Sequence, residues 1–118
     1  MNIRTIQSKY PSAIWFDSAH TGTESGTFDE PYNTFTEAFT AVSSGGVIAV
    51  KDGTHPFVLS SNLLNKDITI VGTGHDAVLE RTITGSLNYS APVQINSAVT
   101  FLDLGLKTTA GGSNSCFM

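Results

Sequence analysis

The amino-acid sequence predicts an all-β fold, a right-handed parallel β-helix (a solenoid) with a short capping α-helix near its N-terminus. Two observations carry this prediction. From residue 47 onward, short strand-type runs alternate with turns rich in Gly, Asn and Asp. Three of these runs look alike, Val47–Val50, Ile68–Val71 and Val99–Leu102, and they start 21 and 31 residues apart. Repeats at intervals of this order are typical of solenoids, in which each coil packs on the next.

The capping helix is predicted to begin at Thr34, which has Glu37 three residues later in the arrangement of a capping box. Apolar residues then recur at helical spacing on one stripe, at Phe35, Ala38, Phe39 and Val42. Gly45 and Gly46 are expected to stop the helix. A short helix with one apolar stripe must pack that stripe against another part of the protein. The expected target is the end of a β stack, whose bare strand edge would otherwise invite aggregation.

The strands are predicted to be short, and one of them, Ile14–Phe16, precedes the helix. The others follow it, at Val47–Val50, Phe57–Leu59, Ile68–Val71, Ala77–Glu80, Arg81–Thr84, Val93–Ile95, Val99–Phe101 and Leu104–Leu106. An antiparallel sandwich is the alternative, but it calls for tight two-residue hairpins, and only Asp52-Gly53 fits that pattern.

Two aromatic residues receive different predictions. The longer second interval implies an inserted loop, which we place at residues 85–91, and such insertions often carry the binding surface. Tyr89 lies within this loop and is the candidate for stacking on a sugar ring. Trp15 is expected to pack beneath the capping helix as part of the core.

Two segments are predicted. Residues 1–12 are polar and are expected to be extended, either as an N-terminal arm that docks on a neighbour or as a disordered segment, and residues 13–118 are expected to form the capped β-helix. The last residues, 115–118, are interpreted as the start of a new apolar strand with no cap after it. We therefore expect either a longer solenoid, of which this is the N-terminal part, or a partner that covers the open end.

Composition and charge argue against several classes of protein. The net charge is −4, and the six Lys and Arg residues are scattered, whereas nucleic-acid binders cluster them. Cys116 is the single cysteine, so no disulfide forms within the chain. No apolar run approaches the roughly 20 residues of a membrane span, and the N-terminal residues have no signal-peptide pattern.

Several motifs resemble the start of the pectin-lyase-like right-handed β-helix superfamily. They lie at residues 15–17, 31–34, 45–50, 52–55 and 67–72. In that superfamily a strand and a helix lead into a "gly-thr-tyr" corner, here Gly53-Thr54-His55. A rung of the form "ile-thr-ile-x-gly" follows, and here it ends at Gly72. These motifs specify a fold shared by phage tailspikes and polysaccharide-active enzymes, and they do not specify a reaction.

The resemblance implies a non-enzymatic virion protein, a component of a phage tail spike, tail fibre or particle surface. Its expected role is assembly or attachment to a host-surface polysaccharide, and its expected location is the virion. Other virion subunits, or the continuation of the chain, are the expected partners, and a homotrimer is implied by the likeness to tailspikes. One alternative is the N-terminal part of a polysaccharide lyase or glycoside hydrolase with its active site beyond residue 118. Another is a bacterial secreted or cell-surface carbohydrate-binding module.

No residue is predicted to be catalytic, and no metal or cofactor is expected. Glycoside hydrolysis needs two facing carboxyl groups, and the ten acidic residues show no such pairing. Asp103 is interpreted as a corner residue that bonds to its own backbone. His20, His55 and His75 lack the common spacing of zinc ligands, and His55 is expected to pack at a corner.

Overall fold

The structure is a computed structural model that describes residues 1–58, 63–83, 94–95 and 97–110. Two helices are present in this part of the chain, α1 (Ile3–Lys9) and α2 (Phe35–Ala41). The strands are β1 (Ile14–Phe16), β2 (Val47–Val50), β3 (Gly53–Pro56), β4 (Leu63–Leu64), β5 (Ile68–Gly72), β6 (Ala77–Ile83), β7 (Gln94–Ile95), β8 (Val99–Leu102) and β9 (Gly105–Ala110).

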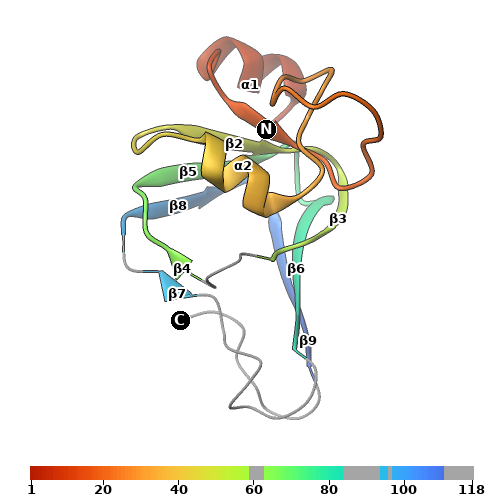
Figure 1. Ribbon diagram of the computed structural model, residues 1–118, viewed down its shortest axis with the longest axis vertical. Coiled ribbons are helices and arrows are strands. Elements are labelled where there is room, and N and C mark those ends of the chain that lie inside the picture. Colours follow the sequence, from red (N-terminus) through yellow and green to blue (C-terminus); the bar gives the residue numbers. More distant parts are fainter. Residues whose placement is uncertain (59–62, 84–93, 96, 111–118) are drawn as a thin grey trace.

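Every strand pair in the described chain is parallel. The strands form three sheets, here called A (order β1-β2-β5-β8), B (order β3-β6-β9) and C (order β4-β7). After β1, the chain visits sheets A, B and C in turn and then repeats the circuit (Figure 1). We call each circuit a coil, so that coil 1 is β2-β3-β4, coil 2 is β5-β6-β7 and coil 3 is β8-β9. The prediction of a β-rich fold with parallel strands and little helix is confirmed.

The register corrects the repeat length. Val47 pairs with Thr69, and Thr69 pairs with Thr100, so the coils repeat after 22 and 31 residues. The first interval was predicted as 21 residues. A slip of one residue exchanges the two faces of a strand. With the observed register, Ile48 and Ile70 lie at the same buried position.

The nine additional residues of coil 2 lie at two corners. Four residues separate β5 from β6, where two separate β2 from β3. Between the paired residues Glu80 and Gln94 there are thirteen residues, against six between Pro56 and Leu63. This second corner includes the predicted insertion at 85–91, whose own structure lies outside the described residues.

The main core fills the space enclosed by the sheets. Its buried members come from α2 and its C-cap, from the inward positions of sheets A, B and C, and from the residue after β3: Phe16, Phe35, Ala38, Val42, Ile48, Val50, Phe57, Leu64, Ile68, Ile70, Ala77 and Leu79. Alternate residues of a strand point to opposite faces, so sheet A also presents an outward set. That set forms a second buried cluster, Trp15, Ala49 and Val71, together with Ile6 of α1. The outward face of sheet A is therefore also covered along this row.

The N-terminal segment differs from the prediction of an extended arm. Asn2 caps α1, since its side chain accepts a hydrogen bond from the Thr5 N–H at 2.8 Å. Ile6 is fully buried against sheet A. Trp15 is buried as expected, but it lies in the cluster beneath α1 and not in the core beneath α2.

Three strand predictions also differ. The corner Gly53-Thr54-His55 is itself extended, as part of β3, whereas Phe57 and Val58, where a strand was predicted to begin, lie just after β3 and are not in a strand. Ala77–Glu80 and the strand predicted to follow it are one continuous element, β6. Within β6, Leu79 and Arg81 are both buried, which keeps the alternation of a single strand. The short strand β4 was not predicted.

Candidate functional site

One end of the strand stack is closed by α2, here called the capped end. Thr34 is the N-cap, because its hydroxyl oxygen accepts from the Glu37 N–H at 3.2 Å. The same hydroxyl donates to the Glu37 carboxylate at 2.7 Å, which holds the pair predicted as a capping box. Phe35 then packs edge-on against Phe16 and Phe57, with ring centroids 5.6 and 4.7 Å apart. The prediction that the helix begins at Thr34 is confirmed, although the carboxylate contact is to the Thr34 hydroxyl, whereas in a capping box it is to the backbone N–H.

The C-terminus of α2 is closed by a residue that the sequence did not indicate. The Lys66 ammonium donates to the carbonyls of Phe39 and Val42 at 2.6 and 2.8 Å, and it lies 4.8 Å from the Phe39 ring. Helix carbonyls at this end lack partners within the helix, and a cation there also meets the negative end of the helix dipole. Gly45 and Gly46, predicted to stop the helix, instead form a turn beyond it, in which Gly45 has a φ of 88°.

The edge of β1 at the capped end is covered as well. Tyr32 forms a parallel bridge to Phe16, its N–H donates to the Trp15 carbonyl at 3.0 Å, and its carbonyl accepts from the Asp17 N–H at 2.9 Å. The Trp15 N–H donates in turn to the Gly26 carbonyl at 2.8 Å. The loop that follows β1 thus satisfies the backbone groups that an edge strand would otherwise leave exposed.

The opposite end of the stack, here called the open end, is formed by β8 and β9. Val99, Phe101 and Leu104 continue the inward positions of the coils, yet they are only partly buried. Leu106 pairs with the fully buried Leu79 and is itself 45% exposed. The apolar side chains that line the interior of the stack are therefore less completely covered at this end than at the capped end.

The outer edge of β8 also carries backbone groups without a described partner. The Ala98 carbonyl accepts from the Ile68 N–H at 3.1 Å, so the even-numbered residues of β8 face β5. In a parallel ladder the N–H and C=O of one residue point to the same side, and successive residues alternate. Val99 and Phe101 therefore direct their N–H groups away from β5, and no strand in the described chain pairs with that edge.

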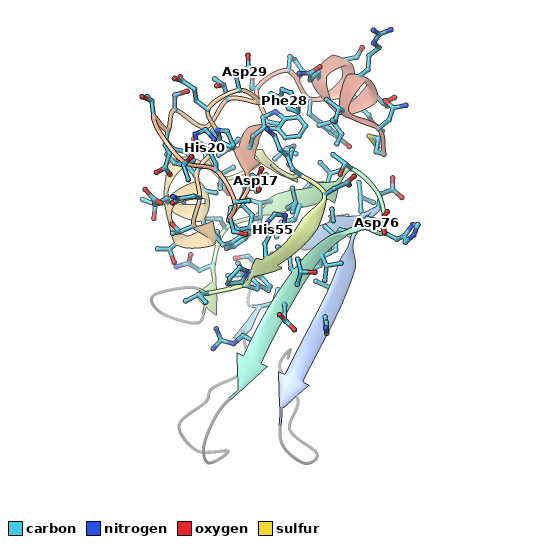
Figure 2. All side chains as sticks on the ribbon, turned by 90° about the vertical axis from the view of Figure 1, so that its right-hand side faces the viewer. Asp17, His20, Phe28, Asp29, His55 and Asp76 are labelled. Carbon is cyan, nitrogen blue, oxygen red and sulfur yellow. The ribbon has the colours of Figure 1, made fainter. Side chains whose placement is uncertain are left out.

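A Ser-His pair joins the residues that follow β1 to β3, and its histidine is His55 (labelled in Figure 2). The Ser18 hydroxyl is 2.8 Å from Nδ1 of His55, and the Ser18 N–H donates to the same nitrogen at 3.1 Å. On the other side of the ring, Nε2 is 2.8 Å from the Lys51 carbonyl. Since a carbonyl only accepts and a backbone N–H only donates, this geometry fits a ring with hydrogen on Nε2 and a lone pair on Nδ1.

This arrangement is suited to holding the corner together and not to nucleophilic catalysis. A serine nucleophile needs hydrogen-bond donors for the oxyanion that forms on its substrate. The N–H of Ser18 is engaged by His55, and that of Ala19 by the Asp17 carboxylate at 3.0 Å. His55 itself is 1% exposed and rests against the Phe16 ring at 5.1 Å. The prediction that His55 packs at a corner is confirmed.

The other predicted residues have structural positions. Gly53 has a φ of 126°, in the region that favours glycine, at the turn into β3. A Cβ on Gly72 would lie 2.5 Å from the Asp103 carbonyl oxygen, so coil 3 passes too close for any side chain there. Asp103 is a corner residue as predicted, with a φ of 50°, but its carboxylate lies 3.2 Å from the Met1 ammonium. Tyr89 lies outside the described residues.

Titratable residues elsewhere are dispersed over the surface. His75 and Asp76 (the latter labelled in Figure 2) are neighbours at the widened corner of coil 2 and are both strongly exposed. Glu80 pairs with Lys107 across sheet B at 3.5 Å. Within the described chain, no three His, Cys, Asp or Glu residues are grouped closely enough to hold a metal ion. Nor does any described helix have the length and apolar character needed to cross a membrane.

No protein-family model matches this chain, and no curated protein or solved structure is significantly similar to it.

Proposed function

We propose that this chain is the capped N-terminal start of a right-handed parallel β-helix, and that it is a non-enzymatic structural protein of a virus particle. A phage tail spike, tail fibre or surface component is the proposed setting, with a role in assembly or in attachment to a host-surface polysaccharide. The observation that carries the proposal is the difference between the two ends of the stack. One end is closed by a helix and a loop, and the other offers apolar side chains and an outer strand edge that no other strand of the described chain pairs with.

The repeating path through sheets A, B and C supports the proposed fold. Parallel strands joined through crossovers are right-handed in nearly all known cases, which gives the proposed hand. In such a stack each coil provides the template for the next, so the open end is suited to another coil of the same chain or to a strand of another subunit. A rod built in this way has the rigidity that a particle surface demands.

The Ser18-His55 corner favours a structural role over an enzymatic one. Its serine lacks free backbone donors, and its histidine is inaccessible to a substrate. The enzyme alternative therefore depends on catalytic groups outside the described residues, in further coils of a longer polypeptide.

Hydrogen exchange at single residues tests the proposed use of the open end. In the isolated 118-residue chain, the N–H groups of Val99 and Phe101 are expected to exchange quickly. The N–H groups of Thr100 and Leu102, which face β5, are expected to be protected and serve as internal controls. In the native polypeptide or particle, all four are expected to be protected. Equal and fast exchange of Val99 and Phe101 in both samples would overturn the proposal.

The biological setting needs a separate measurement. Peptides of this chain are expected in mass spectra of purified virus particles, at a constant ratio to the other particle proteins. If the chain is instead part of a longer polypeptide that degrades a polysaccharide in solution, the enzyme alternative is correct. The denatured intact mass of the native polypeptide, compared with 12.5 kDa, identifies that longer form.

A further inference from the structure

The outward face of sheet A carries a row of apolar side chains along the stack axis. The row consists of Trp15, Ala49, Val71 and Leu102, one from each of the four strands, and the register pairs each with the next. Outward positions on a solvated sheet are normally polar. Trp15, Ala49 and Val71 are nevertheless buried and Leu102 partly so, because α1 and Phe28 of the loop after β1 lie across this face.

α1 is held on this row by Ile6, and by Met1 and Tyr10, which pack against the same cluster. It is also held by the Met1 ammonium, which donates to the Gly72 carbonyl at 3.1 Å. Ile6 is the buried residue of the helix, while Ile3 on the same helix is 38% exposed. A helix of seven residues is not stable alone in water, so α1 must pack against an apolar row. The same row on a second copy of the chain would serve as well as the row of its own copy.

Charge separates α1 from the rest of the chain. Residues 1–16 contain two basic residues, Arg4 and Lys9, and no acidic residue. The remainder contains four basic and ten acidic residues. Two whole copies of this acidic chain repel each other, whereas the basic N-terminal segment of one copy is attracted to the acidic body of another.

The segment that joins α1 to β1 is short and exposed. Pro11 and Ser12 are exposed, and a turn from Tyr10 to Ala13, with an N–H to carbonyl distance of 3.0 Å, reverses the chain direction. Opening this turn moves α1 away from its own sheet without disturbing any strand. Exchange of one element between identical copies reuses the same contacts and is a low-cost way to form dimers.

We propose that α1 is an exchangeable arm that docks on the apolar row of a second copy of this chain. The contacts are those seen within one copy, so Ile6 enters the cluster of Trp15, Ala49 and Val71 of the other molecule. This inference goes beyond the proposed role of the open end, because it concerns a side wall of the stack and a partner of identical sequence. The two can fail independently.

Disulfide trapping between two full-length variants tests the exchange. One chain carries Ile6→Cys and the other Val71→Cys, both with Cys116→Ser, so neither can form the arm-to-row disulfide by itself. They are mixed and oxidised gently, and the covalent heterodimer is separated by non-reducing electrophoresis. Ile3→Cys is the matched control on the exposed side of the same helix. The fluorescence of Trp15, the single tryptophan, reports whether the variants keep the buried cluster.

The expected result is several times more heterodimer with Ile6→Cys than with Ile3→Cys, rising with protein concentration and falling with added salt. A chain carrying both Ile6→Cys and Val71→Cys shows whether the two positions meet within one copy. If that double variant closes internally while the mixture yields no more heterodimer than the control, α1 is a fixed cover and the proposal is wrong. It is equally wrong if neither disulfide forms in variants that keep the Trp15 emission.

Discussion

The two ends of the strand stack are made from the same kind of coil, yet they are finished differently. At the capped end, Phe35 fills the space between Phe16 and Phe57, and Lys66 closes the carbonyl end of α2. At the open end, Phe101 is in register with the fully buried Ile70 of β5 but remains partly exposed. The comparison teaches that one coil cannot bury its own interior, and that each end needs either a cap or another layer.

Removal of the Phe35 ring is expected to have the largest effect on this difference. Phe35→Ala leaves a cavity beneath α2 and should lower the free energy of unfolding by about 3–5 kcal/mol. Phe101→Ala is the matched change at the open end, where the ring is already partly in contact with water, and it should cost less than half as much. Urea unfolding of both variants measures the contrast. Equal losses would show that the open end is as well packed as the capped end.

Loss of the lysine that closes α2 should have an intermediate effect. Lys66→Met keeps much of the side-chain length but removes the donors to the carbonyls of Phe39 and Val42, and a cost of about 1–2 kcal/mol is expected. Lys107→Met is the control, because its exposed pair with Glu80 should contribute at most about 1 kcal/mol. Thermal unfolding followed by circular dichroism compares the two. Identical midpoints would contradict the importance of the Lys66 contacts.

The smallest effect is expected at the corner between β1 and β3. Ser18→Ala removes one of the two donors to Nδ1 of His55 and should cost about 0.5–1.5 kcal/mol. Because the Ser18 N–H still donates, the corner should stay folded and exchange its amide hydrogens only slightly faster. Ser12→Ala, at an exposed position, is the control. A loss several times larger than expected would mean that the hydroxyl does more than join two segments.

The sequence predicted those parts of the fold that depend on local patterns. Thr34 and Glu37 mark the start of α2, and the runs at β2, β5 and β8 are recognisable because strand-forming residues recur between turns. The one-residue error in the first repeat arose from aligning the starts of similar runs. Pairing in the structure is set by which residues face the core, so Ile48 matches Ile70.

Features that depend on contacts distant in sequence were missed. Lys66 donates to the last carbonyls of a helix that ends more than twenty residues earlier, and no local sequence pattern indicates this contact. The docked α1 had a usable signal, because the uninterrupted apolar run Val47–Val50 is typical of a strand buried on both faces. The binding surface expected around Tyr89 stays a prediction, since that residue lies outside the described part of the chain.

The widened corner of coil 2 has a practical consequence. Gly72 and Ala77 keep their pairings with Val50 and Gly53, although four residues lie between them where coil 1 has two. His75 and Asp76 project into solvent there, with side chains 95% and 76% exposed. The stack thus already tolerates extra length at this position, because the strands on either side keep their pairing with the preceding coil. A foreign peptide grafted between Gly74 and His75 should be displayed on the outside of the rod, with the coils unchanged.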